Sequence, residues 1–404
     1  MNNNRYVSFT KEMKKSHTIL IPNMLPMHFA LVDKVLQNYG LHTELLQTQG
    51  QHIKELGLKY VDDDTCSPAI FAVGQFLDAV ESGRYDPNKV ALVIFQADGC
   101  RSAGYAELIR KAIENAGYGQ VPVIPFSLKT QERYSGFKLS LSVLRRAVYA
   151  VFYADLLTLL RNQCRSYEIK SGESQALAEV WTEKLAYEMG RSNKISYKRI
   201  RENYRKIISD FNSIPRMELK KPKVGIVGGM SAKYLPLGNN GLEDILVSEG
   251  AEVAVWELLD LCLYCLYNNI ADIEICGGKR ARRALLNSGY KFLLSKQKDM
   301  IDIIKECSEF EPPMPFDSAV SLVKGYIGVE AMRDEEWLFS AEMLGFAHNG
   351  VSNMVCAKSV DSLSDTEKEI IKHMAKKDPN INIVSLDCDA ENKIKLMLEN
   401  IKND

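Results

Sequence analysis

Short apolar runs of β type alternate with helical patterns in two separate stretches of the chain, and this alternation restricts the possible folds more than any other feature. In the first stretch, the runs expected as strands are residues 18–22, 91–96 and 121–126. The segments expected as helices, each followed by a glycine that ends it, are residues 26–39, 68–82 and 101–116. Because strands that alternate with helices pair in parallel and are covered by those helices, this stretch predicts one doubly wound unit.

The middle of the chain has almost no strand signal, and helical periodicity is expected there in residues 141–160, 176–189 and 197–210. A second alternating set opens at Lys223. Its expected elements are strands at residues 223–229, 252–256, 354–357 and 383–386 and a helix at 335–346. We therefore predict an α/β fold of two Rossmann-like, doubly wound parallel-sheet domains, residues 1–138 and 222–404, joined by a helical connector, residues 139–221.

The composition excludes several classes of protein. Among the 404 residues, 51 Lys and Arg stand against 52 Asp and Glu, so the formal net charge of −1 provides no basic field for nucleic acid. No apolar stretch reaches the roughly 18 residues that a membrane span needs, and residues 1–16 lack the apolar core of a signal peptide. We therefore expect a cytoplasmic protein that binds neither nucleic acid nor membrane, with nine cysteines that are reduced rather than paired in disulfides.

Two cysteines stand in turns that are expected to follow strands, which is where open α/β sheets bind their ligands. Cys66 and Cys100 each precede an expected helix, whose dipole and free backbone N–H groups favour a thiolate. Such thiolates suit an iron–sulfur cluster, because clusters are held by thiolates and tuned by hydrogen bonds to sulfur. The alternative is that both thiols are small apolar side chains that fill tight turns.

For several other candidate groups we prefer a structural role. The glycine-rich residues 225–230 lack the G-x-G-x-x-G spacing, so we expect no nicotinamide cofactor, and Lys233 beyond them could either bind a phosphate or be solvated. His28 follows the first strand and is expected to cap a helix or to pack in the core. Cys262 and Cys265 have C-x-x-C spacing but lie in an apolar helical run without a second pair, which favours core over a zinc site.

A series of longer motifs runs through nearly the whole chain. They are Leu-Pro-Met-His-Phe at residues 25–29, Cys-Ser-Pro-Ala-Ile at 66–70, Gly-Cys-Arg-Ser-Ala-Gly-Tyr at 99–105, Tyr-Glu-Ile-Lys-Ser-Gly-Glu at 167–173, Pro-Lys-Val-Gly-Ile-Val-Gly at 222–228, Glu-Trp-Leu-Phe-Ser-Ala-Glu at 336–342 and Gly-Val-Ser-Asn-Met-Val-Cys at 350–356. In kind and order they resemble the 2-hydroxyacyl-CoA dehydratase/benzoyl-CoA reductase family. The likeness is greatest to the branch that is fused behind CoA-substrate-specific enzyme activases and is related to the double-cubane cluster proteins.

The resemblance implies two Rossmann-like domains that hold an oxygen-sensitive iron–sulfur cluster, of 4Fe–4S or double-cubane type, in the cleft between them. It also implies that an ATP-hydrolysing activator protein supplies single electrons, and that the chain pairs with itself or with a homologous subunit. The chemistry would be that of a lyase or a low-potential reductase component acting on an acyl-CoA thioester. The cluster ligands in such proteins match Cys66, Cys100 and a third cysteine late in the second domain.

At this third ligand the chain departs from the family. The late motif of the family ends in a ligand cysteine, whereas residues 353–362 put Ser362 at that position and keep only the earlier Cys356. A serine hydroxyl is harder to deprotonate than a thiol and is a harder donor, so it is a poor substitute toward iron–sulfide. Asp98 stands at a usual glycine and Trp256 at a usual proline. Together these changes indicate a site that is either rebuilt or lost.

Three hypotheses for the function remain open at this point. In the first, the protein bears a cluster ligated by Cys66 and Cys100, and Cys356, Cys388 or Ser362 completes the set. In the second, it is a cluster-free homologue that acts as a binding or scaffolding subunit. In the third, the two thiols bind another metal such as zinc. Candidates for supporting the cluster or binding substrate phosphates are His28, Asp98, Arg101 and Lys233.

Overall fold

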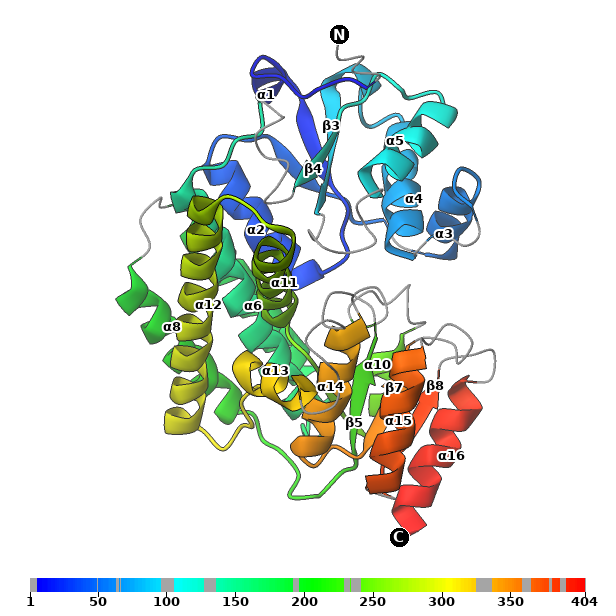
Figure 1. Ribbon diagram of the computed structural model, residues 1–404, viewed down its shortest axis with the longest axis vertical. Coiled ribbons are helices and arrows are strands. Elements are labelled where there is room, and N and C mark those ends of the chain that lie inside the picture. Colours follow the sequence, from blue (N-terminus) through cyan, green and yellow to red (C-terminus); the bar gives the residue numbers. More distant parts are fainter. Residues whose placement is uncertain are drawn as a thin grey trace. The chain divides into compact units, whose positions relative to one another are not determined.

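The computed structural model describes residues 6–403, apart from residues 49, 63–64, 66, 96–104, 127–135, 192–195, 229–232, 234–240, 325–335, 358–364, 378–379 and 386–389. The chain forms two compact units. The first contains Met1–Val151 and Thr182–Ile195, and the second contains Phe152–Trp181 and Ser196–Asp404. Each unit is built around its own sheet (Figure 1).

The sheet of the first unit has four parallel strands in the order β2-β1-β3-β4. These are β1 (Thr18–Ile21), β2 (Thr43–Leu45), β3 (Val90–Phe95) and β4 (Val123–Phe126). The accompanying helices are α1 (Met13–Ser16), α2 (Pro26–Asn38), α3 (Gln51–Leu58), α4 (Ser67–Glu81) and α5 (Tyr105–Asn115), with a 3-10 turn η1 (Pro87–Lys89) before β3. Ile19 of β1 lies opposite both Thr43 of β2 and Ala91 of β3, so β1 is an inner strand.

Alternating apolar side chains explain how this sheet binds its helices. Val90, Leu92 and Ile94 are two residues apart along β3, so they share one face of the sheet. On that face they are buried with Phe76 of α4 and Ile109 of α5 in one continuous core. Helices α4 and α5 lie side by side over it (Figure 1). Burial of these apolar surfaces is the main favourable contribution to holding the helices in place.

The second unit repeats this arrangement with four parallel strands in the order β6-β5-β7-β8. These are β5 (Lys223–Val227), β6 (Glu252–Val255), β7 (Asn353–Cys356) and β8 (Asn382–Ser385). Helices that accompany them are α10 (Leu242–Ser248), α14 (Glu336–His348), α15 (Asp365–Lys377) and α16 (Ala390–Asn403). The core on one face of this sheet joins Val224 and Ile226 of β5 to Leu246 of α10 and Ile394 of α16.

The helical periodicity in the middle of the chain is confirmed by α6 (Leu141–Arg165), α7 (Glu173–Arg191) and α8 (Tyr197–Asn212). The boundary between the two units falls inside α6 and α7, whereas the sequence analysis treated residues 139–221 as a separate connector. After β6 the second unit adds α11 (Leu258–Cys276), α12 (Arg280–Cys307) and α13 (Phe316–Lys324). Helix α12 packs against both α8 and α11.

The predicted α/β class with parallel sheets is confirmed. Strand β2 and helix α3 were not among the expected elements. Strand β2 has only three residues, so its apolar run is too short to detect in the sequence. In each sheet the strand order reverses between two inner strands, β1 and β3 in the first unit and β5 and β7 in the second. Within the described residues, no helix combines the length and the hydropathy required of a membrane span.

Candidate functional site

The carboxyl ends of β5 and β7 meet where the strand order of the second sheet reverses, which is the place where open α/β sheets bind ligands. Just beyond β5, the backbone N–H of Gly228 donates a hydrogen bond to Oε2 of Glu342 over 3.3 Å. The ammonium of Lys233 donates to Oε1 of the same carboxylate and forms an ion pair with it. Glu342 comes from α14 and is 1% exposed, so a buried negative charge stands at this reversal point.

This ion pair determines what Lys233 can do. The lysine is 4% exposed, and a lone ammonium buried to that degree would lose its hydration without compensation. Glu342 supplies the compensating charge. The lysine that the sequence suggested as a phosphate-binding group is therefore bonded to a carboxylate of its own unit.

Helix α11 begins directly beyond β6, and its N-terminus is capped by a carboxylate from another helix. Asp155 of α6 accepts hydrogen bonds from the backbone N–H groups of Leu258 and Leu259, each over 3.0 Å. The first N–H groups of a helix have no partner within the helix, and the helix dipole favours a negative charge beside them. Asp155 is buried, so this capping bond fixes α6 to the carboxyl edge of the sheet.

Two more carboxyl groups stand at the beginning of α11: Glu257 is its N-cap and Asp260 lies in its first turn, and the two side chains are hydrogen-bonded to each other. Burial raises the pKa of Glu257 well above its usual range, and the negative charges of Asp260 and Asp155 raise it further. Burial also raises the pKa of Asp260 to about 7, although the hydrogen bond from Glu257 acts in the opposite direction. This buried pair therefore binds a proton more tightly than carboxyl groups in water do, beside the carboxyl end of β6.

The carboxylate of Asp260 is held in place by Gln297 of α12. The Gln297 Nε2 donates to Oδ1 of Asp260 over 2.9 Å, and its Oε1 accepts from the backbone N–H of Phe316 over 3.0 Å. Phe316 is the first residue of α13, so both polar ends of this buried amide are used. The position of the Asp260 carboxyl group consequently depends on three helices, α11, α12 and α13.

Cys262 and Cys265, the C-x-x-C pair, both lie on α11. Burial raises the pKa of the Cys262 thiol to about 12, and the negative charges of Asp155 and Asp260 contribute in the same direction. A thiol that keeps its proton is a poor metal ligand, but both cysteines are partly exposed and so are not the core residues that the sequence suggested. In the described part of the chain, no three His, Cys, Asp or Glu side chains are arranged to hold a metal ion.

The carboxyl edge of the first sheet carries a network of amide side chains. The backbone N–H of Asn23, just beyond β1, donates to Oε1 of Gln75 over 2.9 Å, and Gln75 Nε2 donates to the carbonyl oxygen of Thr48 over 2.9 Å. The Asn23 side-chain amide donates to Oε1 of Gln47 over 3.4 Å. Two buried oxygens, Oδ1 of Asn23 and Oγ1 of Thr48, have no hydrogen-bond partner among the described residues. Since buried polar atoms are normally satisfied, this edge is suited to a polar ligand.

Six of the site residues expected from the sequence lie outside the described residues, namely Cys66, Asp98, Cys100, Arg101, Ser362 and Cys388. Their places in the chain are still defined by the neighbouring elements. Cys66 directly precedes α4, and Cys100 belongs to the segment between β3 and α5. The element before Cys66 is α3, not a strand as expected, because two consecutive helices connect β2 to β3.

The other expected site residues are described and buried. His28 is the third residue of α2, close to the carboxyl end of β1. Cys356 is the last residue of β7 and is 0% exposed, opposite Val227 of β5 and Ser385 of β8. Cys356 therefore lies at the same reversal point as Glu342.

Asp155, Asp260 and Glu342 were not among the site residues expected from the sequence. Each is an acid in a largely apolar helical stretch, Asp260 together with Glu257, and this pattern was the available signal. An acid of this kind must be paired, protonated or solvated, and only the tertiary contacts distinguish these outcomes.

Comparison of the chain with protein-family models, with curated proteins and with solved structures found no match.

Proposed function

We propose that this protein is an iron–sulfur component with two Rossmann-like domains that resembles the 2-hydroxyacyl-CoA dehydratases and the related reductases. It accepts single electrons from an ATP-hydrolysing activator protein and uses them to reduce or dehydrate an acyl-CoA, paired with itself or with a homologous subunit. One observation carries the proposal. Two cysteines in family-like motifs both precede a helix of the first unit, Cys66 directly before α4 and Cys100 between β3 and α5.

The chemistry of the available donors is compatible with such a cluster. Cys66 directly precedes α4 and Cys100 precedes α5 in the chain, and a thiol at the beginning of a helix is favoured as the thiolate that iron requires. Cys356 offers a further thiol at the end of β7, whereas Ser362 offers a weaker hydroxyl donor. When bound, the cluster supplies one-electron chemistry, and the protein supplies ligands, burial and orientation.

The described residues contribute protons and acceptors to this function. Both reduction and dehydration move protons, and burial raises the proton affinity of Glu257 and Asp260 at the carboxyl edge of the second sheet. The unsatisfied oxygens of Asn23 and Thr48 can accept hydrogen bonds from a ligand at the corresponding edge of the first sheet. The buried pair of Lys233 and Glu342 keeps the reversal point of the second sheet close to neutral.

The proposal is tested by purifying the protein without oxygen, reconstituting it with iron and sulfide, and measuring both elements together with the visible spectrum. We expect wild-type protein to hold iron and acid-labile sulfide, and Cys66→Ala and Cys100→Ala each to lose most of both. Cys307→Ala is the matched control, because Cys307 is the last residue of α12 and belongs to none of the motifs. Reconstituted wild-type protein without iron would contradict the proposal.

The presence of Ser362 at the third ligand position favours a second candidate, a cluster-free homologue that acts as a binding or scaffolding subunit. It predicts a colourless protein whose thermal stability is unchanged in the Cys66→Ala and Cys100→Ala variants. Elemental analysis of the same samples separates both candidates from zinc binding, since zinc lost together with those two thiols would identify a different metal site.

A further inference from the structure

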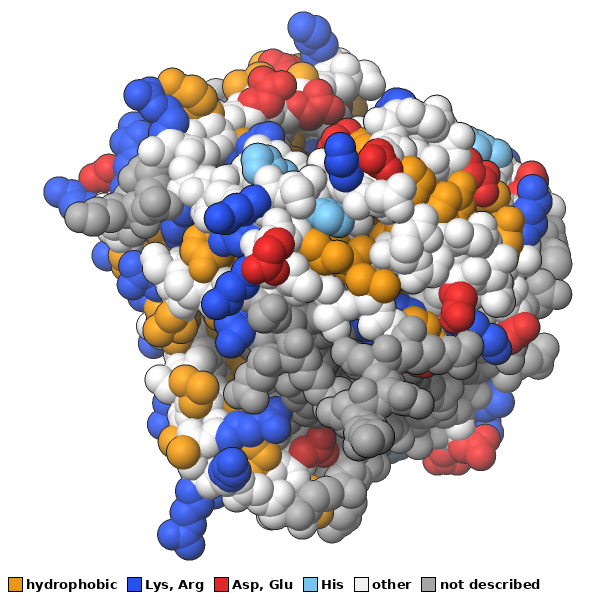
Figure 2. Space-filling view, turned by 90° about the horizontal axis from the view of Figure 1, so that it is seen from above, with side chains coloured by type: hydrophobic (Ala, Val, Ile, Leu, Met, Phe, Trp, Pro, Cys, Tyr) orange, Lys and Arg blue, Asp and Glu red, His pale blue; other side chains and the backbone are white. Residues whose placement is uncertain are grey.

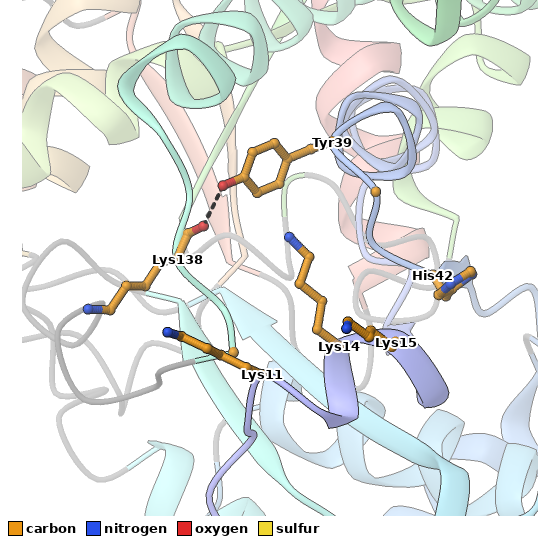
Figure 3. A pocket seen from close by; sticks show the side chains of 8 residues that line it. Lys11, Lys14, Lys15, Tyr39, His42 and Lys138 are labelled. Atoms are coloured by element: carbon orange, nitrogen blue, oxygen red, sulfur yellow. Dashed lines mark hydrogen bonds between the residues drawn. The ribbon is translucent and has the colours of Figure 1, made fainter.

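The first unit contains a second candidate site that the proposed function does not use, an open pocket with a volume of about 550 Å³. Its wall is unusually basic, and the side chains that matter are Lys11, Lys14, Lys15, Tyr39, His42 and Lys138 (Figure 3). Lys15 shortly precedes β1 and His42 directly precedes β2, so the pocket lies at the amino ends of these strands. The proposed function concerns the carboxyl ends, at the opposite edge of the sheet.

Backbone contacts join the segments that form this pocket. The N–H of Gly136 donates to the carbonyl oxygen of Phe9 over 3.2 Å, and a Cβ at Gly136 would lie 2.0 Å from the carbonyl oxygen of Thr10. Glycine is therefore required where the two segments cross. This crossing brings Lys11 and Lys138 to the same pocket although they are far apart in the sequence, and the Lys11 side chain extends toward that of Lys138 (Figure 3).

Tyr39 contacts both the ammonium of Lys14 and the backbone of Lys138, and it brings no negative charge to the pocket. Its hydroxyl donates to the carbonyl oxygen of Lys138 over 3.0 Å, and the ammonium of Lys14 lies 4.4 Å from the centroid of its ring. A cation–π contact of this length holds an ammonium in position but leaves its full positive charge available to a ligand. The aromatic ring thus replaces the carboxylate that usually fixes a surface lysine.

Among the described residues, the charge of the pocket is not balanced by ion pairs with carboxylates. In the described part of the chain, none of Lys11, Lys14, Lys15 and Lys138 forms an ion pair with a carboxylate. The acidic group of the same segment is Glu12, whose pKa is lowered by a hydrogen bond with Thr10 and also by the charges of Lys11 and Lys15. Four ammonium groups against one exposed carboxylate leave an excess of positive charge, and Figure 2 shows lysine and arginine side chains gathered beside histidines on one face.

We propose that this pocket binds the phosphate groups of an organic polyphosphate, a small ligand that carries at least two phosphates. Ammonium groups are effective point charges toward phosphate oxygens, and several of them around one hollow favour a ligand with several negative charges. The volume falls within the usual range of about 300–1,000 Å³ for small-molecule sites, which favours a nucleotide-sized ligand over a polymer. Nucleoside triphosphates and coenzyme A both offer this chemistry.

The experiment is isothermal titration calorimetry of the full chain at low salt with pyrophosphate, ATP, coenzyme A and AMP. We expect at least one of the polyphosphates to bind about tenfold or more tightly than AMP, with an affinity that falls as salt screens the charges. Preference for ATP or for coenzyme A over pyrophosphate identifies which of the two sources the pocket selects. Equal binding of all three shows that the phosphates alone are recognised.

Variants connect the binding to this pocket. Lys14→Gln and Lys138→Gln are each expected to weaken polyphosphate binding about fivefold to tenfold, because each removes one charge-assisted contact. Lys54→Gln is the matched control, an exposed lysine of the same unit on α3, and should bind as the wild type does. Binding that is equal in all three variants, or an affinity for AMP equal to that for the polyphosphates, would overturn the inference. Because the titration needs no iron, its outcome is independent of the cluster test.

Discussion

Single residues place charge inside the second unit, and each of these charges is compensated in a different way. Glu342 is compensated by the ammonium of Lys233, and Asp155 by the N–H groups at the beginning of α11. A buried charge without such compensation is strongly unfavourable. These residues are consequently sensitive positions for both stability and function.

Replacing Glu342 by alanine is expected to lower the free energy of unfolding by about 3–5 kcal/mol, because the buried Lys233 ammonium loses its carboxylate. Urea denaturation followed by circular dichroism measures the change. The control is Glu306→Gln, which breaks the ion pair between Glu306 and Arg205. These two side chains are 60% and 42% exposed, so this substitution should lower the free energy of unfolding by less than about 1 kcal/mol. A loss in Glu342→Ala no greater than in this control would show that the pair is not buried in solution.

At the scale of elements, helices α3 and α4 cross at close range in the first unit. A Cβ at Gly57 would lie 2.1 Å from the carbonyl oxygen of Ile70, and a Cβ at Gly74 would lie 2.0 Å from that of Ile53. The two helices therefore meet backbone to backbone at two glycines, one from each helix. The crossing fixes the position of α4, and the proposed ligand Cys66 directly precedes this helix in the chain.

Substituting Gly74 by alanine is expected to cost about 1–3 kcal/mol, because the added methyl group overlaps a backbone carbonyl that cannot move without separating the helices. Gly190→Ala is the matched control, since Gly190 lies in α7 and its Cβ would meet nothing within 4 Å. That control should gain about 0.5–1 kcal/mol from the better helix propensity of alanine. Thermal unfolding should show a lower melting temperature for Gly74→Ala and a higher one for Gly190→Ala than for the wild type. A stabilised Gly74→Ala variant would refute the close crossing.

At the scale of the whole molecule, the net charge of −1 means that general charge repulsion changes stability little near neutral pH. Specific buried carboxyl groups dominate instead. Burial raises the pKa of Asp33 in the first unit and of Glu252, Glu257 and Asp260 in the second. A group of this kind binds its proton more tightly in the folded than in the unfolded chain, so folding is favoured at low pH and less so as pH rises.

For Asp260 the pH window follows from the unfolded pKa of 3.8 and the folded pKa of about 7. Below this window the carboxyl is protonated in both states, and within it the unfolded chain releases the proton first. The free energy of unfolding should therefore fall as pH rises from about 4 to 7, relative to an Asp260→Asn variant that stays neutral and still accepts from Gln297. Urea denaturation at several pH values measures this difference, and a constant difference would contradict the assignment.

Much of the fold could be predicted from local patterns, because apolar runs and helix-ending glycines act over a few residues. The runs that became β1, β3, β5 and β7 were recognisable for this reason, whereas the three residues of β2 were too few to show a period. The candidate site was only partly predictable. His28, Lys233 and Cys356 were selected from their motifs, but the partner of Lys233 and the raised pKa values of Glu257 and Asp260 were not.

The α/β class, the parallel sheets and the order of the cysteines before helices could all be predicted from the sequence, because they depend on residue type and spacing along the chain. The ion pair of Glu342 with Lys233, the capping of α11 by Asp155 and the pocket shared by Lys11 and Lys138 could be found only in the folded chain. Charge, pKa and close packing depend on distances between residues far apart in the sequence, and the fold alone sets those distances.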